Sequence, residues 1–152
     1  MRNKNGFSLI ELIISIGILA FVAASAIVIF QNQLIGNLGS DAQIVADRLE
    51  DARARAVAGV NGTSWGIHFD NNTTTPYYAL FRGSSYTAAS STYFLSGLVA
   101  FSAPAQGTTA DVIFTKLTGN TAGTTTIILT LASNASSTKS IIVSPQGSIT
   151  VQ

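Results

Sequence analysis

The sequence predicts an α+β protein in which a long N-terminal helix, membrane-spanning in its first half, packs on an antiparallel β-sheet domain. Two observations predict the helix: an unbroken apolar run over residues 7–30, and apolar residues at spacings of three and four over residues 31–58. A third observation predicts the sheet domain over residues 59–152, where apolar residues recur at every second position between turn-rich stretches.

Composition indicates one domain with appendages. The 152 residues are 47% hydrophobic and only 10% charged, and the mean hydropathy is +0.39 because apolar residues concentrate at the front. Cysteine is absent, which excludes disulfides, thiol chemistry and zinc–thiolate sites. The net charge of +1 argues against nucleic acid as a partner, since binding phosphates requires a strongly positive surface.

The apolar run predicts a single membrane span with its N-terminus in the cytoplasm. Residues 7–30 as a helix are about 36 Å long, enough for a bilayer core of about 30 Å. Arg2 and Lys4 precede the run without any acid, and positive charge keeps that end inside. Glu11 is the only charge within the run, and an acid in a span costs about 2.5–3.5 kcal/mol. Something must therefore compensate for Glu11.

Three alternative interpretations of the apolar run each leave at least one of its features unexplained. A secretory signal peptide would be cut after residues 24–26, a small-x-small sequence, yet residues 27–30 remain apolar and Glu11 lies in the apolar region. A plain membrane anchor explains the length and the basic flank but leaves Glu11 unexplained. A buried core helix of a soluble protein explains neither the flank nor the length.

The residues KNGFSLIEL, Lys4–Leu12, resemble the class III signal of type IV pilins and type II secretion pseudopilins. The resemblance implies a pilin-like fold. It also implies that a membrane aspartyl peptidase, the prepilin peptidase, removes the leader, residues 1–6, by cutting between Gly6 and Phe7. The same enzyme then N-methylates Phe7, and the apolar helix stays on the mature protein. Gly6 has no side chain, which suits a narrow protease cleft.

The same resemblance implies a role for Glu11 in assembly. Glu11 lies one helical turn past Phe7, so the α-amino cation of a Phe7 terminus can offset its charge. In the family that terminus belongs to a neighbouring subunit, and the pair sets the axial register. Expected partners are the prepilin peptidase, other pilin or pseudopilin subunits, an inner-membrane assembly platform and, before assembly, the lipid bilayer. The expected location is the inner membrane, followed by a periplasmic or extracellular filament.

The stripe that predicts the second half of the helix comprises Leu34, Leu38, Ala42, Val45, Leu49, Ala52 and Ala56. Gly59 and Gly62 are expected to end the helix near residue 58. Gly36 and Gly39, followed by a capping-box pattern at residues 40–43, are compatible with a bend or short break, and a continuous helix is equally compatible. The proline that kinks many pilin helices is missing here, since prolines occur only at positions 76, 104 and 145.

The expected strands form one antiparallel meander, with the helix as its second layer. They are Trp65–Asp70, Tyr77–Arg82, Tyr93–Phe101, Asp111–Leu117, Thr124–Leu131, Lys139–Val143 and Ser148–Val151. Alternation in the first strand places Trp65, Ile67 and Phe69 on one face of a half-buried strand and His68 on the other. Residues 132–138 are expected to form a turn.

The sequence DARARAVAGVNGTSWGIHFD, residues 51–70, and the hairpin SPQGSITV near the end resemble minor pseudopilin H of type II secretion and the FimT-like minor pilins. The resemblance implies a structural subunit, minor, of a type IV pilus or a type II secretion filament. A major pilin of a divergent type IV pilus and a single-span membrane-anchored surface binding domain are the alternatives. Some FimT-like relatives bind DNA through a basic C-terminal end, but no Lys or Arg follows Lys139 here.

No pattern in the sequence predicts catalysis, a metal site or a cofactor. His68 is the only histidine and is expected to be an exposed strand residue. Residues 70–72 are expected to form a turn, since they lack the ligand spacing of a calcium loop. A Ser/His/acid set, a pair of carboxylates in one cleft and a phosphate-binding glycine loop are all missing from the sequence pattern. We therefore expect a protein that is not an enzyme.

Overall fold

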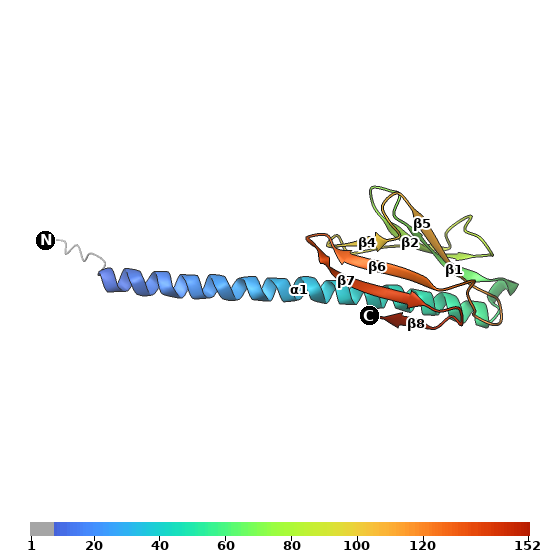
Figure 1. The fold of residues 1–152 in the computed structure, drawn as a ribbon, viewed down its shortest axis with the longest axis horizontal. Helices are drawn as coiled ribbons and strands as arrows, with labels where there is room; N and C mark the ends of the chain where they lie inside the picture. Colours follow the sequence, from blue (N-terminus) through green and yellow to red (C-terminus); the bar gives the residue numbers. More distant parts are fainter. Residues whose placement is uncertain (1–7) are drawn as a thin grey trace. The chain divides into compact units, whose positions relative to one another are not determined.

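The computed structural model describes the backbone of residues 8–152 and, apart from residues 24–35, their side chains. The chain forms two compact units, Met1–Leu34 and Ile35–Gln152. Helix α1 (Leu9–Val57) contributes residues to both units (Figure 1). All the strands belong to the second unit.

Helix α1 ends where glycines allow the chain to turn. At its start, the Leu12 N–H donates to the Ser8 carbonyl at 3.1 Å, which closes the first turn. At its end, Gly59 adopts a left-handed φ of 64°, and its N–H donates to the Ala56 carbonyl at 3.0 Å. A short 3₁₀ turn, η1 (Val60–Gly62), follows. The predicted end of the helix is confirmed.

The backbone of α1 is helical through residues 36–40, so the continuous helix is confirmed there and a break is wrong. Gly36 and Gly39 each weaken the helix by about 1 kcal/mol. Asp41 lies within the capping-box pattern at residues 40–43 and contacts the β domain. Its carboxylate accepts hydrogen bonds from the Ser96 N–H at 3.0 Å and from the Ser96 Oγ at 2.7 Å. Asp41 thereby connects α1 to the β domain.

The β domain consists of two four-stranded antiparallel sheets. Sheet 1 has the order β3–β2–β1–β5, and sheet 2 has the order β4–β6–β7–β8. The strands are β1 (Trp65–Asp70), β2 (Tyr77–Arg82), β3 (Ser91–Phe94), β4 (Val99–Ala103), β5 (Thr109–Phe114), β6 (Thr125–Leu131), β7 (Asn134–Val143) and β8 (Ile149–Val151). The expected single meander is therefore wrong, because β5 returns to sheet 1 after β4 has begun sheet 2.

The main differences from the predicted strand boundaries occur at three places. The strand expected over residues 93–101 is two strands in different sheets, because a turn at Ser96 separates them. β5 ends at Phe114, because Leu117 adopts a left-handed φ of 68° in the turn that follows. β7 begins at Asn134, inside the expected turn, because β6 and β7 pair as a tight hairpin.

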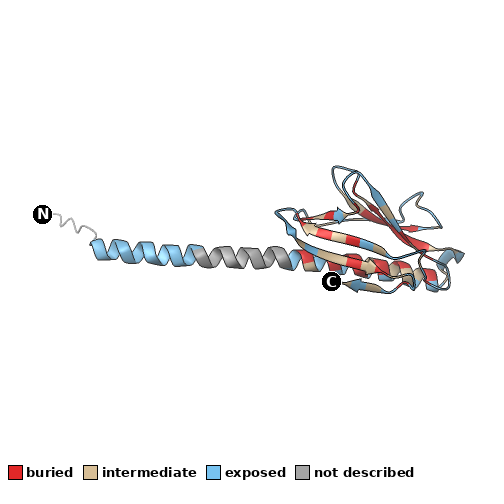
Figure 2. Cartoon of the chain, viewed as in Figure 1, coloured by how far each residue is buried: buried red, intermediate tan, exposed pale blue. Residues whose placement is uncertain are grey.

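The apolar stripe of α1 forms the centre of the core. Its described members are all between 0 and 2% exposed: Leu38, Ala42, Val45, Leu49, Ala52 and Ala56. Figure 2 shows the buried bands of α1 where the helix runs beside the sheets. On β6, Ile127, Leu129 and Leu131 alternate with less buried residues, as in a strand that buries one face. The stripe is confirmed for these residues, and the side chain of Leu34 lies outside the described ones.

Strand β1 is buried on both faces, although its alternation predicted only one buried face. Close packing on the second face requires Gly66, because a Cβ there would lie 2.8 Å from the ring of Phe81. The loop between β2 and β3 covers this face, and its Tyr86 ring meets the Phe81 ring edge to face at 5.4 Å. The alternation of apolar residues along β1 predicted a solvent-exposed outer face. That prediction is wrong because a loop covers the outer face of sheet 1.

Gly147 lies where two turns meet α1, and its replacement by alanine should destabilise the fold. Its φ is 78°, and a Cβ would collide with the Gly119 carbonyl and lie 2.8 Å from the Arg53 Nε. We expect Gly147→Ala to lower the free energy of unfolding by about 2–4 kcal/mol, measured by urea titration of tryptophan fluorescence. Gly123→Ala is the control, because nothing lies within 4 Å of its Cβ position. Equal stability of the two variants would contradict the packing at Gly147.

Candidate functional site

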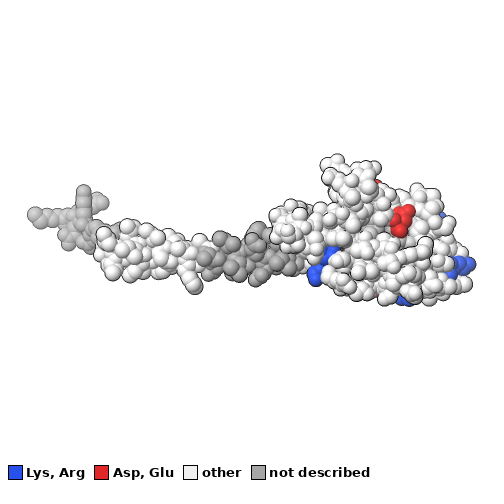
Figure 3. Space-filling view, in the orientation of Figure 1, with Lys and Arg blue, Asp and Glu red and all other residues white. Residues whose placement is uncertain are grey.

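The described side chains of the first unit, residues 8–23, form a helical segment with an exposed apolar surface. The exposed large residues are Leu9, Ile10, Leu12, Ile13, Ile14, Ile16, Ile18, Leu19, Phe21 and Val22. Figure 3 shows no charged atom on the visible face of this segment. A contiguous apolar surface of this kind marks a contact with another protein or with a membrane.

Glu11 is the only charged residue in this segment. It lies in the first turn of α1, where the helix dipole favours a negative charge. Its backbone carbonyl accepts a hydrogen bond from the Ser15 Oγ at 2.7 Å. Its side chain is exposed, and its carboxylate has no hydrogen bond or ion pair within the described part of the chain. The carboxylate is therefore available to a group outside that part.

The other predicted residues of the N-terminal signal, Arg2, Lys4, Gly6 and Phe7, lie outside the described residues. Cleavage at Gly6–Phe7, methylation of Phe7 and the role of the two basic residues therefore stay predictions. The expected span over residues 7–30 also falls partly outside. Within the part of the chain that the structure describes, no helical segment has the length and hydropathy needed to cross a membrane.

His68 lies in a polar and aromatic cluster on the outer face of sheet 1. It is only 7% exposed. Its Nδ1 is 2.5 Å from the Oδ1 of Asp111, its register partner on β5, and its Nε2 is 4.0 Å from the Oδ2 of Asp70. The ring of Tyr86 covers the imidazole in a parallel stack, with 3.8 Å between ring centroids. The expectation of an exposed strand residue is therefore wrong, because the loop that carries Tyr86 buries it.

Asn71 is a second buried polar residue, and it connects the two sheets. It follows β1 of sheet 1, and its Nδ2 donates to the carbonyls of Phe101 and Pro104, at 3.3 and 2.8 Å, at the end of β4 in sheet 2. The turn expected at residues 70–72 is confirmed, since the Asp70 carboxylate accepts from the Asn72 N–H at 2.7 Å. The sequence pattern predicted the turn but not the burial of Asn71, which depends on a strand thirty residues away.

Among the described residues, no three His, Cys, Asp or Glu side chains lie close enough to hold a metal ion. The expectations that the protein binds no metal or cofactor and catalyses no reaction rest on the sequence and stay predictions.

Tyr77 belongs to the cluster around His68, and its pKa is shifted by its neighbours. A hydrogen bond with Tyr86, followed by burial and the charge of Asp70, raises the pKa of Tyr77 from 10.0 to about 12. Because folded Tyr77 keeps its proton to higher pH than unfolded Tyr77, its contribution to stability is complete below pH 10. That contribution is lost as the pH rises from 10 towards 12.

The variant Tyr86→Phe tests the origin of this shift. It keeps the ring that stacks on His68 and removes only the hydroxyl, so we expect the pKa of Tyr77 to fall towards 10. NMR of tyrosine labelled at the ring carbons measures it directly. Tyr93→Phe is the control, because the ring of Tyr93 stacks on Tyr78 instead, at 5.4 Å. An unchanged titration of Tyr77 in Tyr86→Phe would place the cause elsewhere.

Known proteins resemble this chain both in its N-terminal segment and in its fold. Residues 1–27 match the family model of the prokaryotic N-terminal methylation motif. The fold matches two crystal structures of the type IV minor pilin FimU from Pseudomonas aeruginosa strain PAO1. In one, the TM-score is 0.55 at 16% identity, over 76% of this chain and 92% of the FimU chain. In the other, it is 0.57 at 15% identity, over 77% and 89%. No curated protein matches the sequence significantly.

The two positive comparisons agree with each other. The matched motif contains every residue predicted for the signal, from Arg2 to Glu11. The fold match confirms the expected fold class, an N-terminal helix packed on antiparallel sheets. The resemblance to type IV pilins is confirmed by motif and fold together. The chain thus carries the prokaryotic N-terminal methylation motif ahead of a domain with the fold of a type IV minor pilin.

Proposed function

We propose that this chain is a structural subunit, minor, of a type IV pilus or a type II secretion filament. The observation that carries the proposal is Glu11. It is a single carboxylate without a partner in the described chain, on a segment of exposed apolar side chains within the methylation motif. Water is a poor solvent for that segment, whereas a bilayer, or the neighbouring helices of a filament, cover it.

Processing supplies the counter-ion of Glu11. Hydrolysis between Gly6 and Phe7 leaves a carboxylate on Gly6 and an α-amino group on Phe7, and this amine stays cationic after methylation. In the apolar core of a filament, the Phe7 terminus of one subunit and Glu11 of its neighbour compensate each other. A subunit displaced along the axis buries both charges unpaired, which costs about 3–5 kcal/mol. The pair therefore selects one register.

The same features define the route of the subunit. Arg2 and Lys4 keep the leader in the cytoplasm, and residues 7–30 cross the inner membrane once. The inner-membrane assembly platform then transfers the subunit into a periplasmic or extracellular filament. Removing Arg2 and Lys4 leaves six basic against seven acidic residues, so the mature chain has a net charge of −1. This charge disfavours nucleic acid as the main partner.

The likeness to FimU, a minor pilin, supports the minor role. A major pilin of a divergent type IV pilus is the second candidate, because the methylation motif fits it equally well. The copy number of the chain in sheared filaments separates the two. The third candidate, a membrane-anchored binding domain that does not assemble into a filament, is less favoured because it assigns no role to Glu11.

The processing site has a direct test. Mass spectrometry of the protein from its own host should show a mature chain that begins with N-methylated Phe7. This result is expected because the class III signal directs cleavage after Gly6. A chain that begins at Ile27, after the small-x-small sequence at residues 24–26, would instead identify a secretory signal peptide.

The role of Glu11 is tested by the neutral variants Glu11→Ala and Glu11→Gln. Membrane insertion should be intact or improved, because removing the charge saves about 2.5–3.5 kcal/mol in a span. Cleavage after Gly6 should continue. Assembly should fail, because the Phe7 terminus of the adjoining subunit loses its counter-ion. Cross-linking to neighbouring subunits in isolated membranes measures assembly.

Glu50→Gln is the matched control for this experiment. Glu50 is an exposed acid on the same helix, paired only loosely with Arg53 at 3.8 Å. Its loss should leave cross-linking at the wild-type level, since exposed pairs contribute little. If Glu11→Ala and Glu11→Gln assemble as well as Glu50→Gln, the register role is wrong and the segment is better described as a simple anchor.

A further inference from the structure

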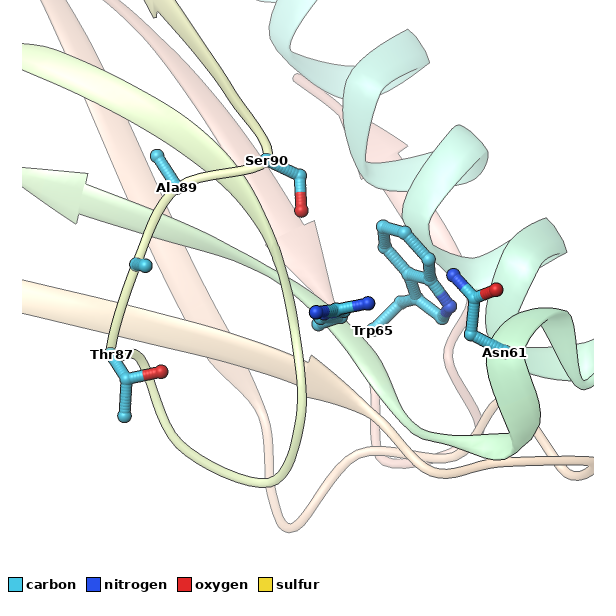
Figure 4. A pocket seen from close by; sticks show the side chains of 7 residues that line it. Asn61, Trp65, Thr87, Ala89 and Ser90 are labelled. Atoms are coloured by element: carbon cyan, nitrogen blue, oxygen red, sulfur yellow. The ribbon is translucent and has the colours of Figure 1, made fainter.

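A cleft lies beyond the C-terminal end of α1, between η1 and the loop that joins β2 to β3. It has a volume of about 300 Å³ and is lined by Asn61, Trp65, Arg82, Thr87, Ala88, Ala89 and Ser90. Figure 4 shows Thr87, Ala89 and Ser90 on the loop at one side of the cleft and Trp65 and Asn61 at the other. An adjoining hollow of about 330 Å³ shares Asn61 and Arg82. These two residues therefore lie where both spaces meet.

Arg82 differs from the arginines of α1 because it has no partner. Arg55 pairs with Asp51 at 3.0 Å, and the guanidinium of Arg48 lies 4.5 Å from the centre of the Tyr93 ring. Arg82 is exposed at the end of β2, and no hydrogen bond, ion pair or ring contact engages it within residues 8–23 and 36–152. Neither hollow contains an acidic residue in its lining. The guanidinium is a free cation in a cleft without a counter-charge.

The groups beside Arg82 are hydrogen-bond donors without protein acceptors. The Asn61 amide and the hydroxyls of Thr87 and Ser90 make no hydrogen bond to the described chain. Asn61 also adopts a left-handed φ of 57°, a conformation that is uncommon for residues other than glycine and that occurs often at binding sites. Trp65 contributes an apolar wall, since its Nε1 already donates to the Val60 carbonyl at 3.0 Å.

The loop that forms one side of the cleft is held in place. At its start, the Gly83 N–H donates to the Ser64 carbonyl at 2.8 Å, and at its end the Ser90 N–H donates to the Leu80 carbonyl at 2.7 Å. Between them, the Tyr86 ring stacks on His68. The donors of the cleft are therefore positioned before any ligand arrives, which lowers the entropic cost of binding.

We infer that this cleft binds a carboxylate group. The planar guanidinium of Arg82 offers two parallel N–H donors, which match the two oxygens of a carboxylate, and the amide and hydroxyls add further donors. Only one cation lines the cleft, so a single negative charge is balanced, whereas inorganic phosphate carries more than one at neutral pH. The carboxylate belongs either to a peptide or to an acidic sugar. This inference does not depend on the filament role.

Trp65 is the only tryptophan, so its fluorescence reports on the cleft of the full-length protein in detergent micelles. Acetate, N-acetylglycine, glucuronate and inorganic phosphate are titrated at constant ionic strength, with chloride as the balancing anion. The three carboxylates should each give a saturable change, with N-acetylglycine binding more tightly if the natural source is a peptide and glucuronate if it is a sugar. Tighter binding of either compound supports the inference that the cleft binds a carboxylate.

Arg82→Gln should weaken carboxylate binding about tenfold or more. Arg82→Lys should weaken it less, because lysine keeps the positive charge but lacks the two parallel N–H donors of the guanidinium. Lys139→Gln removes a positive charge from β7, away from the cleft, and should bind as the wild type does. The tryptophan emission of each unliganded variant confirms that it is folded. Equal binding by Arg82→Gln and the wild type, no saturable change with any carboxylate, or tighter binding of phosphate than of acetate would overturn the inference.

Discussion

The second unit depends on one interaction, the burial of the apolar face of α1 over residues 38–56. The alanines on this face are fully buried, and so are the larger side chains of Val45 and Leu49, each of which contributes about 1.5–3 kcal/mol. Polar contacts fix both ends of the face. Ser96, just before sheet 2 begins, donates to α1, and the Leu117 N–H, just after β5 of sheet 1, donates to the Ala56 carbonyl at 2.9 Å. The helix therefore sets the position of both sheets.

Local patterns predicted the parts of the structure that are themselves local. The spacing of three and four residues predicted the buried stripe of α1, and Gly59 predicted where the helix ends. Both features depend only on residues that are close in the sequence. β2 was predicted to the residue, since turns bound it on both sides. Of the candidate site, the position of Glu11 on a helix agrees with the predicted helix, whereas its role in assembly stays a prediction and residues 1–7 lie outside the described chain.

The remaining errors share a cause, which is contact between segments distant in sequence. His68 pairs with Asp111, forty-three residues away, and Asn71 bonds to carbonyls thirty residues on. Alternation along β1 gives the face on which His68 lies but cannot reveal a loop that folds over it. The sequence could not predict that Arg82 lacks a partner for the same reason. Whether a surface arginine forms an ion pair depends on which acidic residues the fold brings near it.

The interleaved order of the strands also decides how the domain is able to fold. β1 and β2 are adjacent in the chain and pair as neighbours, but the second partner of β1 is β5, which follows β4. β4, in turn, has no partner until β6 has been made. β4 of sheet 2 therefore lies in the chain between two strands of sheet 1, and its own partner, β6, follows only after sheet 1 has its last strand. Such long-range pairing raises the contact order and slows folding, and nascent chains that stop before residue 125 expose β4 as an unpaired edge.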